Sequence, residues 1–177
     1  MSFSLREIKS ATSDGALFKL LSAELQGRLP EKVHQSPDVL VRAIRGLPSG
    51  LRAMAAIHRL DVSMAMDDLG WHFHNFHHPE LCDETARGLR ELGAGEVLEI
   101  FEQARSRFEA HWESVGNRSQ ESLAVFPEWY ESSGLEAALA PLNKRLWKIC
   151  SESPDHGLLR FWLDYARQHP ERLLDKP

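Results

Sequence analysis

Apolar residues recur at helical spacing along most of this chain. Ser13 and Asp14 are followed by a first apolar run of Leu17, Leu20, Leu21, Leu25 and Leu29. These two polar residues can cap a helix that ends near Gly27. A second helix is expected from Ser36–Asp38 to Gly46, because proline suits a first helical turn and glycine a helix end. No segment alternates apolar and polar residues as a strand does, so the pattern predicts an all-α protein.

The longest apolar stripe belongs to the next segment and predicts a helix from about Ser49 to Leu69. Its members are Leu51, Met54, Ala55, His58, Val62, Ala65 and Leu69. Because they repeat every three or four residues, they share one face of the helix. We expect this face to form the centre of a helical bundle.

Aromatic and histidine residues fill the following segment, residues 71–78, and predict a short helical turn that ends before Pro79. A helix from Pro79 and another after Gly93–Gly95 are expected to form a central antiparallel hairpin. Residues 116–127 are mostly polar and predict a long surface loop.

Two further helices complete the pattern. The first carries apolar residues from Leu135 to Ile149 and includes Pro141, and the second runs from about Asp155 to just before Pro170. Together the segments predict a compact, single-domain array of about seven helices over residues 1–177, with a peripheral N-terminal helix within residues 1–35. A chain of 177 residues buries about 70% of its unfolded surface, so it needs neither metals nor disulfides to fold.

Composition narrows the class of protein. Hydrophobic residues make up 42% of the chain and charged residues 27%, which excludes wholesale disorder. No apolar window reaches the roughly 18 residues of a membrane span, and the N-terminus lacks the pattern of a signal peptide. Cys82 and Cys150 lie in helical patterns typical of reduced, buried thiols. We therefore expect a cytoplasmic protein that contacts no membrane and needs no cofactor.

Charge is distributed unevenly along the chain, although the formal net charge is only -5. Residues 61–103 contain two basic and ten acidic residues. The ten are Asp61, Asp67, Asp68, Glu80, Asp83, Glu84, Glu91, Glu96, Glu99 and Glu102. Carboxylates on a rigid helical surface can imitate a row of phosphates, so these residues are predicted to bind a basic protein partner. An ordinary solvated helix face is the alternative.

Direct binding to nucleic acid is not expected. The arginines Arg42, Arg45, Arg52 and Arg59 are spread over two predicted helices, and no basic run or basic motif interleaved with aromatic residues occurs. Neutralising phosphates needs clustered cations, and a sequence pI of about 6.0 indicates no excess of them.

The segment Trp71–His78 is the strongest candidate for chemistry, because it contains the histidines His72, His74, His77 and His78. His74 and His78 lie one helical turn apart and could together bind zinc or iron. His58, with Asp61 three residues later, could form a general base. Both features support an alternative function, a metal-dependent or general-base enzyme. Histidines that cover an aromatic plug, and a core histidine held by a carboxylate, explain the same residues without catalysis.

Five short segments carry a resemblance to a known family. They are Leu47–Ala53, His58–Asp61, Leu69–Asn75, Glu91–Glu99 and Tyr165–Glu171. In these segments and their order, residues 40–173 resemble the DNA mimic protein 19-like family of bacteria. The resemblance implies an all-helical protein that is often a homodimer. The resemblance also implies a property of one characterised branch of the family: an acidic surface that imitates DNA and occupies the DNA-binding face of a transcriptional regulator.

The residues and the resemblance together predict a non-enzymatic interaction protein whose acidic middle segment docks a DNA-binding regulator. An inhibitor or immunity-type protein that binds a toxin is a further alternative, because it would rely on the same electrostatic attraction. The identity of the partner separates these two functions.

Overall fold

The computed structural model describes residues 3–111, 125–152 and 157–175. Within these ranges every regular element is a helix: there are ten α-helices and three short 3₁₀ helices, and no strand. The prediction of an all-α protein is therefore confirmed. The expected number of about seven helices is too low, because several helices of six to nine residues are too short for apolar spacing to reveal.

The helices follow one another with short connections. In chain order they are α1 (Leu5–Ser10), α2 (Asp14–Arg28), η1 (Glu31–Gln35), α3 (Pro37–Arg45), α4 (Ser49–Met66), α5 (Leu69–Phe76), α6 (Pro79–Glu91), α7 (Gly95–Glu109), α9 (Val125–Ser132), α10 (Leu135–Ser151), η2 (Gly157–Leu159), α11 (Arg160–Gln168) and η3 (Pro170–Leu173). The predicted starts of three helices are confirmed. Ser13 caps α2, its Oγ accepting the N–H of Ala16 at 3.2 Å, and prolines occupy the first turn of α3 and α6.

Two helices were missed by the sequence pattern. One is α1, which is only six residues long and contributes a single buried residue, Ile8, to the core. The other is α9, which begins inside the segment predicted as a loop, so that Val125–Pro127 are helical. The rest of that predicted loop, residues 116–124, and the helix start predicted near Asp155 lie outside the described residues.

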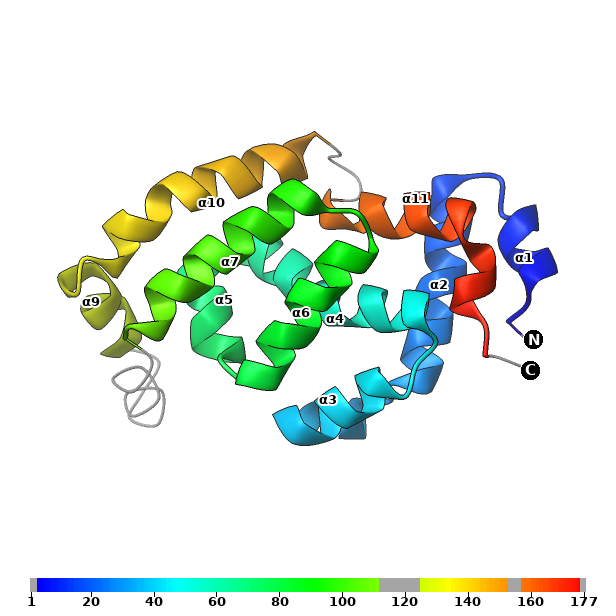
Figure 1. Cartoon of the computed structure of the whole chain (residues 1–177), viewed down its shortest axis with the longest axis horizontal. Coiled ribbons are helices and arrows are strands. Elements are labelled where there is room, and N and C mark those ends of the chain that lie inside the picture. The colour runs from blue at the N-terminus through cyan, green and yellow to red at the C-terminus, as the bar shows by residue number, and fades with distance from the viewer. Residues whose placement is uncertain (1–2, 112–124, 153–156, 176–177) are drawn as a thin grey trace.

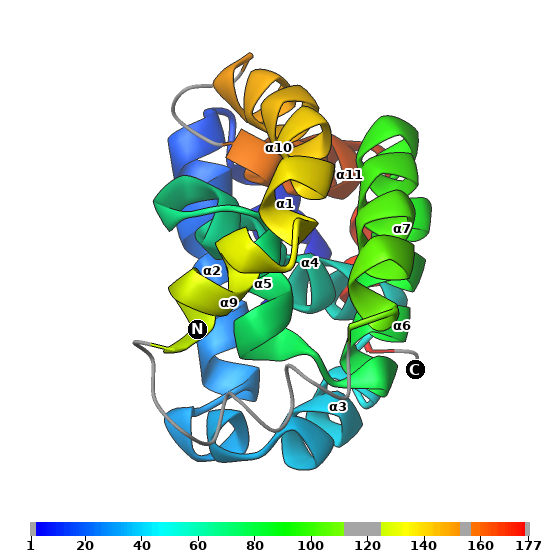
Figure 2. The same cartoon turned by 90° about the vertical axis from the view of Figure 1, so that its left-hand side faces the viewer.

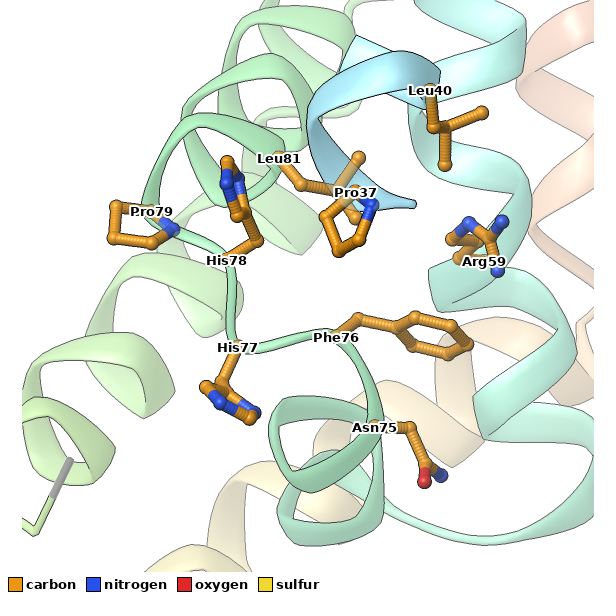
Figure 3. A pocket seen from close by; sticks show the side chains of 9 residues that line it. All are labelled: Pro37, Leu40, Arg59, Asn75, Phe76, His77, His78, Pro79 and Leu81. Carbon is orange, nitrogen blue, oxygen red and sulfur yellow. The ribbon is translucent and has the colours of Figure 1, made fainter. Parts of the chain in front are cut away.

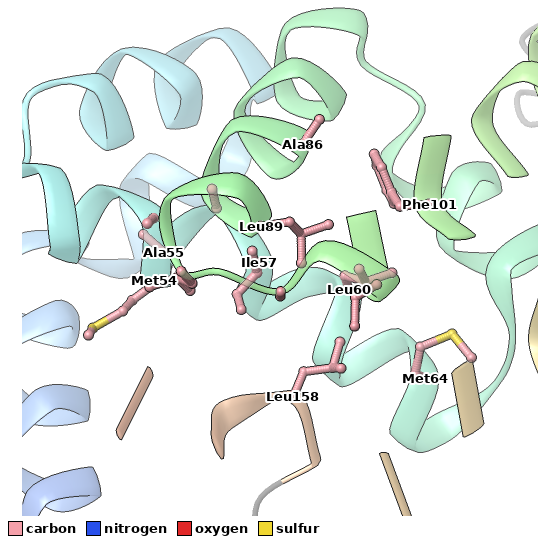
Figure 4. Packing of buried hydrophobic residues seen from close by; sticks show 14 of the residues in the cluster. Met54, Ala55, Ile57, Leu60, Met64, Ala86, Leu89, Phe101 and Leu158 are labelled. Atoms are coloured by element: carbon pink, nitrogen blue, oxygen red, sulfur yellow. The ribbon is translucent and has the colours of Figure 1, made fainter. Parts of the chain in front are cut away.

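The centre of the molecule is α4, which is crossed by α6 at very short range. A Cβ atom placed on Gly88 of α6 would lie 2.9 Å from the carbonyl oxygen of Ala53, so only glycine allows this approach. Around the crossing, Figure 4 shows buried side chains from four elements, among them Met54, Ile57, Leu60, Leu89, Phe101 and Leu158. The core is thus continuous from α4 through α6 and α7 to η2.

The stripe predicted for the third helix is correct at its start and at its last member, but not between them. Leu51, Met54 and Ala55 are buried, as is Leu69, which belongs to α5, whereas His58, Val62 and Ala65 are exposed. The buried face continues instead through Ile57, Leu60 and Met64. Both continuations have helical spacing, and α4 is in contact with α5, α6 and α10. Periodicity alone could not choose between them.

Other helices flank this centre at the two ends of the molecule. In Figure 1, α10 runs beside α7 with α9 at one end, while α1, α2 and α11 lie at the opposite end. Seen from the first end, α5, α9 and α10 face the viewer together (Figure 2). This end brings residues near 68, 130 and 143 into contact, although they are far apart in the sequence.

Candidate partner-binding surface

The ten carboxylates predicted to bind a partner do not share one environment. Three of them, Asp61, Asp68 and Glu84, are used inside the fold. Six lie on the surface within ion-pairing distance of arginines: Glu80, Asp83, Glu91, Glu96, Glu99 and Glu102. Asp67 alone of the ten is exposed and forms no hydrogen bond or ion pair through its carboxylate with a described residue.

Glu84 is a structural residue. Its side chain is 4% exposed and accepts hydrogen bonds from the guanidinium groups of Arg45, Arg52 and Arg87 at 2.7–3.1 Å. Burial raises the pKa of Glu84, but the bonds from Arg52, Arg45 and Arg87 outweigh it and lower that pKa to about 2. A partner protein has no access to this carboxylate, so Glu84 ties α3, α4 and α6 together instead.

Asp61 and Asp68 each hold two parts of the chain together. Asp61 accepts the backbone N–H of Leu158 at 2.8 Å, and burial raises the pKa of Asp61. Asp68 caps α5 by accepting the N–H of Trp71 at 3.0 Å. Its other oxygen accepts the hydroxyl of Tyr130 and the side-chain amide of Asn143, at 3.1 and 3.2 Å. Asp68 therefore fixes α5 against α9 and α10.

The surface carboxylates of α6 and α7 are balanced by arginines of the same chain. Arg105 lies 2.6 Å from Asp83, Arg90 lies 3.3 Å from Glu102, and Arg145 of α10 lies 3.5 and 3.6 Å from Glu96 and Glu99. Likewise, Glu80 pairs with Arg45, and Glu91 with Arg172 and the hydroxyl of Tyr165. The negative field suggested by the charge of the linear segment is therefore reduced on this face.

A second group of carboxylates lies on the segments that meet at Tyr130, namely the α4–α5 junction, α9 and the start of α10. We call it the acidic corner and define it as Asp67, Asp68, Glu131 and Glu136. Asp68 accepts the Tyr130 hydroxyl, Glu131 follows Tyr130 in α9, and the charge of Glu136 acts on the same phenol. Burial, and then the nearby Asp68, raise the pKa of Tyr130. None of the four forms an ion pair with a described residue.

Sequence reasoning missed Glu131 and Glu136 because they lie outside the acidic segment. A weak local signal does mark them, because residues 125–143 contain three acidic residues, Glu128, Glu131 and Glu136, and no basic residue. Close packing brings α9 against α5: a Cβ atom on Gly70 would lie 2.3 Å from the Tyr130 ring. The absence of a side chain at Gly70 therefore lets α9 approach α5.

Apolar side chains border the acidic corner. Met66 is 81% exposed and Trp147 is 45% exposed. The indole Nε1 of Trp147 donates to the carbonyl oxygen of Asp67 at 3.2 Å, which holds the ring at the end of α4. Exposed Met and Trp side chains are typical of protein–protein contacts, so this part of the surface combines negative charge with apolar contact area.

The four histidines of the predicted cluster do not converge. His72 is buried, its Nδ1 lies 3.0 Å from the Ser63 hydroxyl, and burial lowers the pKa of His72 to about 3. The ring of His74 stacks on Phe126 with centroids 3.9 Å apart. The last two histidines lie beyond α5, where His78 Nε2 is 2.9 Å from Asp38. The predicted pairing of His74 with His78 on a metal is not formed, because α5 ends at Phe76.

The second catalytic candidate is also divided. His58 is exposed and lies beside Trp162, with ring centroids 5.8 Å apart, whereas Asp61 is turned toward Leu158. Among the described residues, no group of three or more His, Cys, Asp or Glu side chains is arranged to hold a metal ion. In the same part of the chain, no helix is long and apolar enough to cross a membrane.

Comparison with known proteins gives one match. A family model described as DMP19-like protein matches residues 45–169. No curated protein and no solved structure matches the chain. The matched residues begin at the end of α3 and end directly after α11, so they include every residue of the acidic corner.

Proposed function

This chain belongs to the DMP19-like protein family, and on that premise we propose that it is a non-enzymatic interaction protein that imitates DNA. Its partner is a basic DNA-binding protein, such as a transcriptional regulator. The arginines and lysines that normally contact phosphates bind carboxylates of this chain instead, through charge-assisted hydrogen bonds.

The acidic corner is the proposed contact surface. Its four carboxylates have no cation of the described chain to neutralise them, so a partner's cations gain their full attraction. This lack of internal cations is the observation that carries the assignment. The corner is also rigid, because Asp68 is fixed by three hydrogen bonds from α5, α9 and α10. A rigid surface loses little conformational entropy on binding.

Met66 and Trp147 complete the proposed surface. Electrostatic attraction steers association and fixes orientation, while burial of aromatic and sulfur-containing side chains supplies much of the affinity. Trp147 is held by its bond to the carbonyl oxygen of Asp67, so it adds contact area close to an exposed carboxylate. A DNA-binding protein with apolar side chains next to its phosphate-binding arginines would fit this combination.

The carboxylates of α6 and α7 are a secondary proposal. A partner could reach Glu96, Glu99 and Glu102 only by competing with Arg145 and Arg90. An exposed ion pair contributes at most about 1 kcal/mol to stability. Replacing an ion pair within the chain by one with the partner therefore changes the free energy of binding only a little. We therefore expect these residues to contribute mainly to long-range attraction.

The test begins by capturing DNA-binding proteins from the cells that produce this chain and purifying the one that binds. Its dissociation constant is then measured by isothermal titration calorimetry at 50 and 300 mM NaCl, with and without duplex DNA. We expect affinity to fall at least tenfold with salt, and the duplex to compete with the chain. Simultaneous binding of both, or affinity independent of salt, would contradict the proposal.

Two variants with the same change of charge locate the surface. Asp67→Asn, Glu131→Gln and Glu136→Gln together are expected to weaken binding at least tenfold. The matched control, Glu96→Gln with Glu99→Gln and Glu102→Gln, is expected to weaken it less than threefold, because Arg145 and Arg90 already pair with these three carboxylates. Both triple variants change only exposed side chains, so thermal unfolding should stay close to that of the unmodified chain. Equal effects would assign the contact to net charge alone.

A further inference from the structure

Two adjoining cavities lie beside α4. The larger, about 540 Å³, is mainly apolar and is bordered by Phe18 and Leu25 of α2, Val62 of α4 and Trp162 of α11. The smaller, about 490 Å³, is more polar and includes Asn75, His77 and His78. Both are lined by Leu40, Arg59 and Phe76, so the two cavities meet at these residues.

Arg59 places a positive charge at this junction. Its guanidinium carbon lies 4.7 Å from the centroid of the Phe76 ring. Figure 3 shows the Arg59 side chain beside that ring on one side of the smaller cavity, with His77 and His78 on the other. Burial lowers the pKa of Arg59, which means that its charge is partly removed from water. Any anion that reaches it is attracted more strongly than it would be at an open surface.

The walls of the larger cavity leave apolar surface in contact with water. Val62 is 40% exposed although it lies on the apolar stripe of α4. Trp162 is 2% exposed, and its Nε1–H has no acceptor among the described residues, which leaves a buried donor at the wall. An apolar group in this cavity would cover Val62, and burial of each methylene contributes about 0.8 kcal/mol.

We propose that the two cavities form one binding site for a small organic anion with an apolar chain or ring. The apolar body occupies the larger cavity between α2 and α4, and the carboxylate pairs with Arg59 at the junction. Asn75 lines the smaller cavity, and its side-chain amide can donate hydrogen bonds to the same head group or to its water. A volume of about 540 Å³ is within the range of small-molecule sites. This site is separate from the acidic corner and does not depend on the function proposed for it.

Three probes of equal chain length test the proposal: octanoate, octan-1-ol and octylamine. Binding of each to the full chain is measured by isothermal titration calorimetry at neutral pH. We expect octanoate to bind at one site at least tenfold more tightly than the alcohol, and the amine to bind most weakly. Equal affinity for the three probes, or binding at many sites, would overturn the assignment of an anion site.

Variants separate the two halves of the site. Arg59→Met should reduce the affinity for octanoate to that for octanol, while Arg59→Lys should restore part of it. Arg42→Met is the matched control: it removes an exposed arginine of α3 outside both cavities and should leave the affinity for octanoate unchanged.

Val62→Trp fills the larger cavity from an exposed position and should abolish binding of all three probes. Octanoate binding that survives both Arg59→Met and Val62→Trp, with thermal unfolding unchanged, would place the ligand elsewhere and refute the proposal.

Discussion

The α4–α6 crossing and the acidic corner both contain carboxylates, but they use them in opposite ways. At the crossing, Glu84 is buried and surrounded by three arginines. At the corner, Glu131 and Glu136 are exposed and pair with no arginine in the part of the chain that the structure describes. The first arrangement stabilises the fold and leaves no charge for a partner, whereas the second leaves its charge available to one.

This difference shows that the position of cations decides the role of an acidic residue more than the acidic content of a segment does. Residues 61–103 are strongly acidic in sequence, yet arginines from α3, α4, α7, α10 and η3 reach into that segment. The corner has fewer carboxylates, but none of them forms an ion pair with a cation among the described residues. The contrast can be tested by removing the cations or the carboxylates one region at a time.

The largest effect is expected at the crossing. Glu84→Gln removes the charge that holds three guanidinium groups, so the free energy of unfolding should fall by about 3 kcal/mol. Denaturant titration followed by circular dichroism measures it. Glu80→Gln, which removes the exposed partner of Arg45, is the control and should cost less than about 0.5 kcal/mol. Equal effects of the two substitutions would mean that burial of Glu84 does not matter.

The same residue should make stability depend on pH. The pKa of Glu84 is about 2 in the fold against 4.5 in the unfolded reference, so the folded state binds this proton more weakly. Its contribution is therefore fully present above about pH 4.5 and is lost as pH falls toward 2. In Glu84→Gln this part of the acid destabilisation should be absent. An unchanged slope of stability against pH between 4.5 and 2 would contradict the assignment.

A smaller effect is expected from crowding the acidic corner. Gly70→Ala adds a Cβ atom 2.3 Å from the Tyr130 ring, which must move away and release Asp68. Stability should fall by about 1 to 3 kcal/mol, and affinity for the basic partner should fall with it. Gly15→Ala in α2, where nothing lies within 4 Å, is the matched control and should be neutral or stabilising. Unchanged affinity in Gly70→Ala would show that the geometry of the corner is not needed.

The sequence predicted the helical class and several boundaries, since these depend on local rules. Ser13, Pro37 and Pro79 act through their immediate neighbours and were read correctly. The second half of α4 could not be read, because Leu60 and Val62 both continue a helical stripe and only packing decides which is buried. His58 was assigned to the core for the same reason: it has the spacing of the apolar stripe, and only packing shows that it is exposed.

The sequence predicted that the candidate surface would be acidic, but it did not predict which residues would form it. A negative surface for a basic partner follows from the acidic segment and the family resemblance. Asp67 and Asp68 were among the ten residues named, but Glu131 and Glu136 lie on α9 and α10, which contact Asp68 through Tyr130 and Asn143. The arginine partners of Glu96, Glu99 and Glu102 come partly from α10, which is distant in sequence. Ion pairs between distant segments leave no local pattern.

The smallest expected effect distinguishes the two acidic surfaces most directly. Arg145→Gln removes the cation beside Glu96 and Glu99 and so makes the α6–α7 face more negative without touching the corner. Stability should change by less than about 0.5 kcal/mol, because the pair is exposed. If the partner contacts the corner, its dissociation constant should change less than twofold, as it should in the equal-charge control Lys19→Gln. Calorimetry at 50 mM NaCl measures both variants. A threefold or larger gain in Arg145→Gln alone, absent at 300 mM NaCl, would move the contact to α6 and α7, since only a carboxylate that the partner touches benefits from losing its own arginine.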